Sequence, residues 1–150
     1  MLEEIYNHLQ LRDNLHSSGM PTPEQVSSLA EEGIQVVINL ATPKSEGWIP
    51  DEQERVEAQN IAYYGIPVDW DKPTMADLNK FMAAMDNHKY EKILVHCQAN
   101  YRATCFIALH RINFLGWAPE NAFKDLRKIW NPAEYPIWQK FIEESLRAQS

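Results

Sequence analysis

The sequence predicts an α/β fold, with a single domain in which a central, mainly parallel sheet is flanked by helices. Short apolar runs typical of buried strands alternate along the chain with segments of helical period, which is the order of a parallel sheet with crossover helices. The length of 150 residues suits one domain, and residues 1–150 contain no repeat or biased tract. Residues 1–20 carry no clear pattern, so their structure is left open.

Three strands are predicted from their apolar composition. They are residues 34–40 (IQVVINL), 61–68 (IAYYGIPV) and the short run 93–96 (ILVH). Near-continuous apolar runs of this kind are typical of strands that are covered on both faces. Ligands of such sheets bind beyond the carboxyl ends of the strands, so we expect functional residues there.

The helices are predicted from their start signals and their apolar spacing. Thr22, Pro23 and Gln25 have the spacing of a capping box, and Gly33 is suited to end the helix that they begin. Residues 102–115 are apolar nearly all round, which predicts a buried central helix. The other predicted helices are residues 51–60, one capped by Thr74, one opened by Pro119, and a last one carrying Trp138, Phe141, Ile142 and Leu146.

Composition and charge argue against several functions. The net charge is −7, and the Lys and Arg residues are scattered, which argues against a nucleic-acid or membrane partner. The first residues lack the pattern of a signal peptide, and the apolar stretches are too short to span a membrane. Two cysteines make no disulfide framework. We therefore expect a cytoplasmic protein.

The loop after the third strand is the best candidate for chemistry. Cys97 directly follows the strand, and Arg102 lies at the start of the central helix. Backbone N–H groups and the helix dipole at such a position favour a bound anion, and the same field favours a nucleophilic thiolate. Arg102 can place two N–H groups on an oxyanion. A nucleophile, an anion site and a cation are thus predicted within one segment.

This segment resembles the signature loop of the cysteine-dependent protein tyrosine and dual-specificity phosphatases, His-Cys-x5-Arg-Ser/Thr. The opening SSGMPTPEQVSSLAEEGIQVVINL and the long helical tail are also similar, in particular to bacterial phosphatase-like domains that are sometimes fused to β-lactamase-like hydrolases. The resemblance extends over residues 15–147 by element order. It implies a three-layer phosphatase-like fold and the hydrolysis of a phosphate monoester without a cofactor.

The resemblance also implies roles for individual residues. Cys97 would form a thiophosphate intermediate, Arg102 would hold the phosphate oxygens, and Thr104 would hydrogen-bond Cys97. Asp69 or Asp71 would supply the proton for the leaving group, and Asp69 has the Asp-x3-Pro spacing of many phosphatase acid loops. The substrate would be a phosphorylated small molecule or a phosphoprotein. The remaining residues of the anion-binding loop would be His96, Gln98, Ala99, Asn100, Tyr101 and Ala103.

The loop departs from the family pattern in one respect. Cys97 and Arg102 enclose four residues instead of five, so Ala103 occupies the usual place of the arginine. Asn100 replaces a glycine, and asparagine tolerates a positive φ. The tighter spacing resembles that of rhodanese-type sulfurtransferases, although a glycine-rich segment ending in Trp is missing after it. A persulfide carrier on Cys97 and a weakly catalytic anion-binding module therefore remain as alternatives.

Several other residues are expected to be structural. Cys105 lies within the apolar helix and is expected in the core, and His96 is expected to be a buried residue that orients the loop. Trp70 and Tyr101 could wall the pocket. The five histidines form no ligand cluster, so no metal site is expected. The tryptophans expected in the core are Trp117, Trp130 and Trp138.

Overall fold

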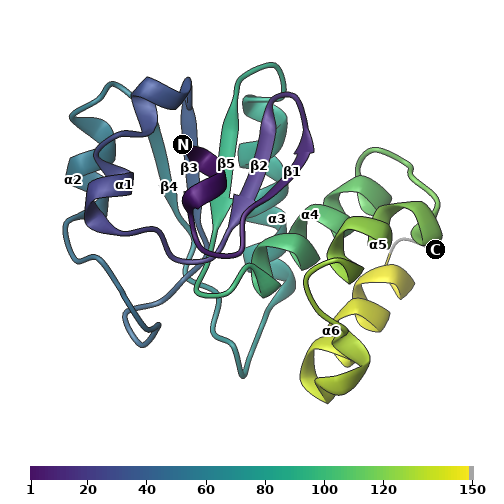
Figure 1. The fold of residues 1–150 in the computed structure, drawn as a ribbon. Helices are drawn as coiled ribbons and strands as arrows, with labels where there is room; N and C mark the ends of the chain where they lie inside the picture. Colours follow the sequence, from purple (N-terminus) through teal and green to yellow (C-terminus); the bar gives the residue numbers. More distant parts are fainter. Residues whose placement is uncertain (149–150) are drawn as a thin grey trace.

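The computed structural model describes residues 1–148 and has one five-stranded sheet (Figure 1). The strands, in their order across the sheet, are β1 (Leu9–Arg12), β2 (Leu15–Ser18), β5 (Ile93–His96), β3 (Val36–Asn39) and β4 (Ala62–Gly65). β1 is antiparallel to β2, and all other neighbours are parallel. This confirms the predicted α/β fold with a mainly parallel sheet.

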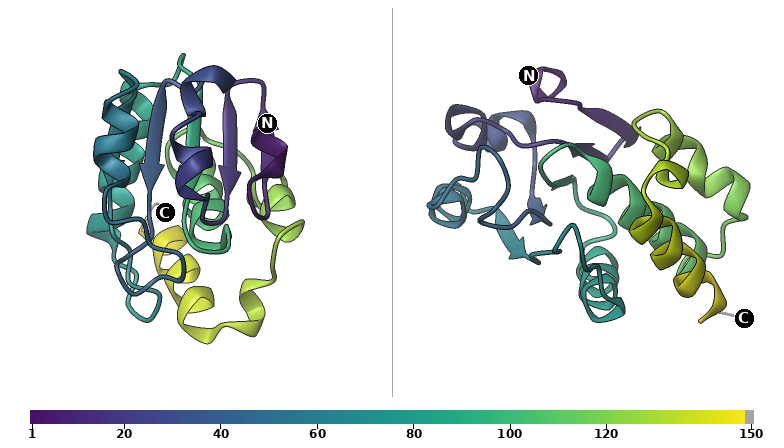
Figure 2. Two further views of the ribbon diagram at one scale, coloured as in Figure 1. Left: turned by 60° about the vertical axis from the view of Figure 1, so that its left-hand side comes forward. Right: turned by 90° about the horizontal axis from the view of Figure 1, so that it is seen from below.

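Helices cover both faces of the sheet, as Figure 2 shows. The α1 and α2 helices lie on one side, α3 and α4 lie on the other, and α5 and α6 pack outside α4. Within residues 1–148, no helix has both the length and the apolar character needed to cross a bilayer. The helices are α1 (Pro23–Val26), α2 (Glu52–Glu57), α3 (Met75–Asn87), α4 (Tyr101–Asn113), α5 (Pro119–Arg127) and α6 (Pro136–Arg147), with 3-10 turns η1 (Leu2–Glu4), η2 (Leu29–Glu32) and η3 (Pro132–Glu134).

The alternation of side chains along the central strands divides the core into two layers. Val36 and Ile38 of β3 join the cluster beneath α3, α4 and α6, while Val37 points to the opposite cluster beneath α1 and α2. On β5, Leu94 joins the same opposite cluster. Both layers are buried, which explains why the strands read as continuous apolar runs instead of alternating ones.

The predicted helix after Thr22 begins correctly but is not continuous. The Thr22 side chain accepts from Gln25 N, and the Gln25 side chain accepts from Thr22 N, so the capping box is formed. Gly33 ends the segment with φ 81°, as its lack of a Cβ permits. Between them the helix breaks after one turn, where the Ser28 hydroxyl donates to Glu24 O at 3.1 Å. Serine side chains compete with the helical backbone in this way, and the prediction of one helix was wrong here.

The first twenty residues form elements that their sequence did not indicate. They contain η1 and the β1–β2 hairpin, and β2 lies beside β5 near the middle of the sheet. Its sequence, LHSS, has one large apolar residue, yet all four residues are buried. The place of β2 in the sheet depends on its pairing with β5, which lies more than seventy residues later in the chain. The local pattern of apolar residues does not predict that pairing.

Two buried histidines make the stability of this fold depend on pH. His16 on β2 lies 2.8 Å from His8, between Nδ1 and Nε2. Burial, followed by the charges of His8 and Lys92, lowers the pKa of His16 to about 4. Burial and the positive charge of Arg12 lower the pKa of His110 to about 4. Both rings are therefore held neutral in the folded state at pH values where an unfolded histidine is charged.

We expect the free energy of unfolding to fall as the pH is lowered from about 6.5 to about 4. In this window the unfolded chain binds protons at His16 and His110 that the folded chain does not, so acid favours unfolding. Urea unfolding of the wild type and of a His16→Gln/His110→Gln variant at several pH values measures this. The variant should lose less stability than the wild type across the window, and equal losses would contradict the assignment.

Candidate active site

Cys97 lies at the carboxyl edge of the sheet, at the end of its central strand. It directly follows β5, which lies between β2 and β3. Its backbone N donates to Ser18 O of β2 at 3.3 Å. The Cys97 side chain is fully buried from solvent and lines a cavity of about 300 Å³. The nucleophile predicted from the sequence is therefore at the floor of a pocket.

The loop from Cys97 to α4 has its carbonyl groups held by neighbouring segments. Gln98 O accepts from Met20 N at 2.9 Å, and Ala99 O accepts from the Asn7 side chain at 2.8 Å. The Asn100 side chain donates in return to Asn7 O at 2.8 Å. Asn100 has φ 71°, the left-handed conformation expected of a residue that replaces glycine. The loop conformation is thus fixed by the N-terminal segment.

The loop leads directly into the N-terminus of α4. Asn100 is the N-cap, and the N–H groups of the first turn have no acceptors within the helix. Thr104 N makes the first helical bond, to Asn100 O at 3.2 Å. Free N–H groups and the helix dipole favour negative charge at this point. The geometry therefore suits a thiolate and a bound anion.

Arg102 lines the same cavity as Cys97, as predicted. It is 5% exposed, and its guanidinium Nη1 donates to Val68 O at 2.8 Å while Nη2 lies 3.4 Å from Ser45 Oγ. These contacts hold the cation between the loops that follow β3 and β4. Ala103 is completely buried in the main core cluster. The side chain at position 103 faces the core and the side chain at position 102 faces the pocket. This explains why the arginine is at position 102 and not at position 103.

Aromatic side chains form the walls of the cavity. Trp70, Tyr101 and Tyr135 line it. Tyr101 stacks on Trp130 with ring centroids 4.8 Å apart, and Trp138 Nε1 donates to Trp70 O at 2.8 Å. The predicted pocket wall of Trp70 and Tyr101 is therefore present, and the residues behind it come from the C-terminal helical segments.

Three expectations about core residues have different outcomes. Cys105 is fully buried, and burial raises the pKa of its thiol. Trp130 and Trp138 are buried as expected. Trp117 is 41% exposed and lies over the guanidinium of Arg111, with Arg111 Cζ 4.3 Å from the ring centroid. Its placement in the core was wrong, because it follows the end of α4 in a turn and not on the buried face of a helix.

The hydroxyl of Thr104 does not make the predicted hydrogen bond to Cys97. It donates to Asn100 O at 2.7 Å, one turn back in α4, and accepts from Trp130 Nε1 at 3.0 Å. The helix begins at Tyr101, which places Thr104 inside it. There the carbonyl four residues back is the nearest acceptor. Thr104 therefore anchors the aromatic wall.

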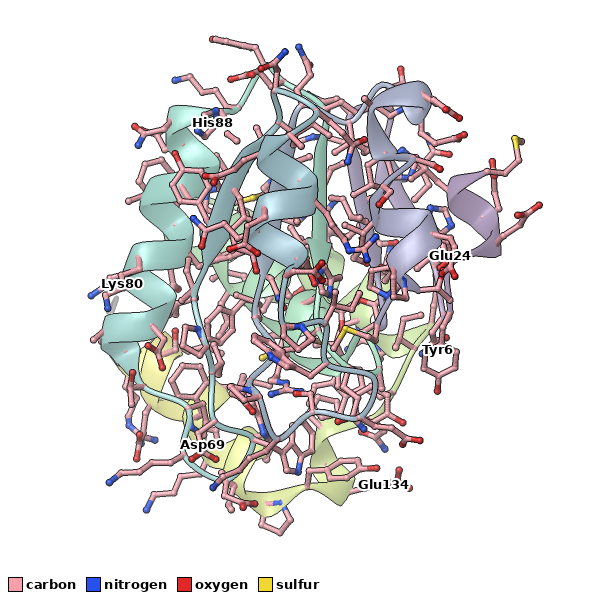
Figure 3. The ribbon with its side chains drawn as sticks, turned by 90° about the vertical axis from the view of Figure 1, so that its left-hand side faces the viewer. Tyr6, Glu24, Asp69, Lys80, His88 and Glu134 are labelled. Atoms are coloured by element: carbon pink, nitrogen blue, oxygen red, sulfur yellow. The ribbon has the colours of Figure 1, made fainter. Side chains whose placement is uncertain are left out.

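The two candidate acids lie on the loop that borders the cavity, without lining it. Asp69 Oδ1 accepts from Asp71 N at 2.9 Å, and both residues are exposed. Trp70, which lies between them, is the residue of this loop that lines the cavity. Figure 3 shows Asp69 at the end of the molecule opposite His88. The structure thus brings Cys97 and Arg102 together and leaves Asp69 and Asp71 at the rim.

A family model described as a dual-specificity or protein tyrosine phosphatase domain fused to NAD⁺ kinase (PTP-NADK) matches residues 5–127. The chain belongs to the PTP-NADK family. A DUF442 phosphatase candidate from Shewanella putrefaciens CN-32 is 38% identical to it, with a TM-score of 0.88, and the match covers 99% of this chain and 97% of that one. No curated protein matches the chain.

More distant structures have the same fold as this PTP-NADK domain. The core catalytic domain of the PP-IP phosphatase SIW14 from S. cerevisiae is 21% identical, with a TM-score of 0.73 over 93% of this chain and 85% of that one. TpbA from P. aeruginosa, in a complex with pTyr, is 16% identical, with a TM-score of 0.70 over 91% and 82%. The fold is that of the cysteine-type phosphatases, and the comparisons do not favour the sulfurtransferase alternative.

Several residues of the candidate site were not predicted from the sequence. Ser45 and Val68 hold Arg102, Tyr135 lines the cavity, and Asn7 holds the loop. Glu52, at the start of α2, is buried against His96. Val68 contributes only its backbone carbonyl. The others are polar or aromatic, in a segment that is irregular or starts a helix, where many such residues are solvated. No local signal distinguishes them.

The described residues offer no cluster for a metal. Within residues 1–148, no group of three His, Cys, Asp or Glu side chains could hold an ion. A second hollow of about 520 Å³ lies beside the loop, lined in part by Tyr6, Met20 and Glu46. It shares Gln98 and Ala99 with the cavity of Cys97. The cavity of Cys97 therefore adjoins a larger hollow.

Proposed function

We propose that this domain hydrolyses phosphate monoesters through a thiophosphate intermediate on Cys97. The observation that carries the proposal is that Cys97 and Arg102 line one cavity of about 300 Å³ at the N-terminus of α4. A nucleophile, a cation and free backbone N–H groups at one point are what phosphoryl transfer to a thiolate requires. Membership of a phosphatase family supports the same chemistry.

The reaction proceeds in two steps. The Cys97 thiolate attacks phosphorus, the S–P bond forms, and the P–O bond to the leaving group breaks. The leaving oxygen takes a proton from a carboxylic acid. Water then attacks the thiophosphate, gives its proton to the same carboxylate, and releases inorganic phosphate with the restored thiolate.

Arg102 and the loop backbone stabilise the charge of the phosphoryl group in both steps. The guanidinium has more N–H donors than its contacts with Val68 and Ser45 use, and the remaining donors are available to equatorial oxygens. The N–H groups of residues 98–102 supply the rest of the anion site. The substrate is a phosphorylated small molecule or a phosphoprotein, and the adjoining hollow has room for the part beyond the phosphate.

The proposal is tested by detecting the intermediate. Reduced protein is mixed with an aryl phosphate, quenched in acid and analysed by intact mass, and a second sample is treated with thiosulfate. A phosphoryl adduct on Cys97, with release of phosphate that vanadate inhibits, is the expected result. A stable gain of one sulfur atom without phosphate release would overturn the proposal and identify a persulfide carrier.

Asp69→Asn should slow the hydrolysis of a substrate with a poor leaving group by about 10²-fold. We propose Asp69 as the acid because of its spacing to Pro73, and an asparagine oxygen can still accept from Asp71 N, so the turn is preserved. The comparison is phenyl phosphate against p-nitrophenyl phosphate, since the better leaving group needs less protonation. Asp71→Asn is the matched control. If Asp71→Asn alone shows the leaving-group dependence, Asp71 is the acid.

A further inference from the structure

A buried carboxylate and imidazole lie directly behind the nucleophile. Glu52 Oε2 is 2.6 Å from His96 Nε2, and the two side chains are 2% and 0% exposed. His96 is the residue before Cys97, while Glu52 is 44 positions away at the start of α2. The second oxygen, Glu52 Oε1, has no hydrogen-bond partner among the described residues. A buried carboxylate with an unpaired oxygen destabilises the fold, so we expect its role to lie in its contact with His96.

Both ring nitrogens of His96 face oxygen atoms. Nε2 faces the Glu52 carboxylate, and Nδ1 lies 3.4 Å from the carbonyl oxygen of Cys97. A neutral imidazole has one N–H and donates to one of them only. Two donated bonds require one more proton than a neutral histidine and an ionised glutamate carry. The proton is either on the ring, which forms an imidazolium–carboxylate pair, or on Glu52, which then donates to Nε2.

The net charge of the Glu52–His96 pair affects the electrostatic field at Cys97. With the additional proton, the pair is neutral in either arrangement and Nδ1–H points at the Cys97 carbonyl. Without it, the pair carries a buried negative charge next to the residue that must become a thiolate, and like charges in a poorly solvated region disfavour each other.

The other titratable groups of this region are Tyr63, Glu54 and Glu57. Tyr63 on β4 is its titratable neighbour on the sheet, with its phenol oxygen 3.1 Å from Asn39 Nδ2. Burial and then the charge of Glu52 raise the pKa of Tyr63 to about 12, so this phenol stays neutral. The carboxylates of Glu54 and Glu57 on α2 add negative charge to the same region.

We propose that Glu52 is a positioning residue whose carboxylate holds the additional proton on the ring of His96, the residue next to Cys97, and thereby supports the thiolate of Cys97. The role rests on the proposed function, in which the thiolate is the nucleophile. Glu52 does not line the cavity, so its effect on the reaction passes through His96. Glutamine at position 52 keeps the shape of the side chain, but its uncharged amide does not hold a proton on the ring, so His96 loses the positive charge next to Cys97.

The first test measures the pH dependence of Cys97 alkylation by iodoacetamide, in a Cys105→Ala background, for the parent and for Glu52→Gln. We expect the midpoint of the alkylation profile to rise by about one pH unit in Glu52→Gln. The matched control is Glu91→Gln, which removes a second His–Glu contact, 2.7 Å between His88 Nδ1 and Glu91 Oε1, at the end of the molecule marked by His88 in Figure 3. This control should not change the midpoint.

The second measurement needs no substitution and therefore does not depend on the folding of Glu52→Gln. NMR of isotope-labelled histidine in the wild-type protein reports which ring nitrogens of His96 carry protons. Protons on both Nδ1 and Nε2 are expected. An unprotonated Nδ1 or Nε2, or an unchanged midpoint in folded Glu52→Gln, would overturn the role of Glu52. If the midpoint shifts but aryl phosphate is not hydrolysed, the proposed function fails and this inference stands.

Discussion

Replacing Cys97 by serine is expected to lower kcat for an aryl phosphate by about 10⁴-fold. Serine fits the space of the thiol at the floor of the cavity, but its hydroxyl does not ionise near neutral pH. The anion site of Arg102 and the loop backbone remains intact, so binding of inorganic phosphate should be retained. Steady-state kinetics and calorimetric titration of phosphate measure the two effects separately.

Cys105→Ala is the control for this experiment. Cys105 is on α4, the helix that follows the loop of Cys97. It is fully buried, and its thiol has a pKa raised by burial, so it is not expected to react. The variant should keep kcat close to that of the wild type. Turnover retained in Cys97→Ser, or lost equally in Cys105→Ala, would exclude Cys97 as the nucleophile.

Arg102→Ala is expected to lower kcat/KM by about 10²- to 10³-fold. The substitution removes the cation that we propose stabilises the phosphoryl oxygens, and it also frees Val68 O and Ser45 Oγ, which the guanidinium holds. Arg102→Lys should recover only part of the loss, because an ammonium group is a point charge without the planar fork. Kinetics on p-nitrophenyl phosphate with folded protein gives the comparison.

The Arg111→Ala variant shows whether the effect of Arg102→Ala comes from losing the cation in the cavity or from losing a buried arginine of α4. Arg111 is also on α4, is 3% exposed, and its Nη1 donates to Asp125 Oδ2 at 2.7 Å. Its removal should destabilise the fold and leave kcat/KM unchanged. If Arg111→Ala reduces kcat/KM as much as Arg102→Ala, the effect of Arg102 comes from the stability of the helix and not from the anion site.

Moving the arginine tests why the spacing is four residues. In an Arg102→Ala/Ala103→Arg variant the family spacing is restored in the sequence. Since Ala103 is packed in the core, we expect this variant to be less stable and no more active than Arg102→Ala. Recovered activity would show that a side chain at position 103 reaches the cavity.

The elements that the sequence predicted well are those specified by neighbouring residues. The Thr74 side chain accepts from Asp77 N and starts α3 as expected, and β5 has the predicted bounds Ile93–His96. The predicted strand 61–68 is shorter, Ala62–Gly65, although Val68 N still bonds to Leu40 O beyond its end. Cap hydrogen bonds and apolar runs involve residues a few positions apart, so the local sequence predicts them.

The site was predicted in part for the same reason. Cys97 and Arg102 are five positions apart at a strand–helix junction, and the anion site follows from that local geometry. Thr104 was placed by family spacing, and the helix start gave its hydroxyl a different acceptor. Asp69 and Asp71 were placed on the correct loop, but the conformation of that loop points Trp70 into the cavity instead.

The sequence alone determined the α/β order of elements, the resemblance to the cysteine-type phosphatases and the pairing of Cys97 with Arg102. The tertiary structure decided that β2 lies beside β5, that Arg102 is held by Val68 and Ser45, and that Glu52 faces His96. The physical reason is sequence separation. Contacts within a helix turn or a loop are set by local chemistry, whereas a buried contact between residues 44 positions apart exists only after the sheet has brought their elements together.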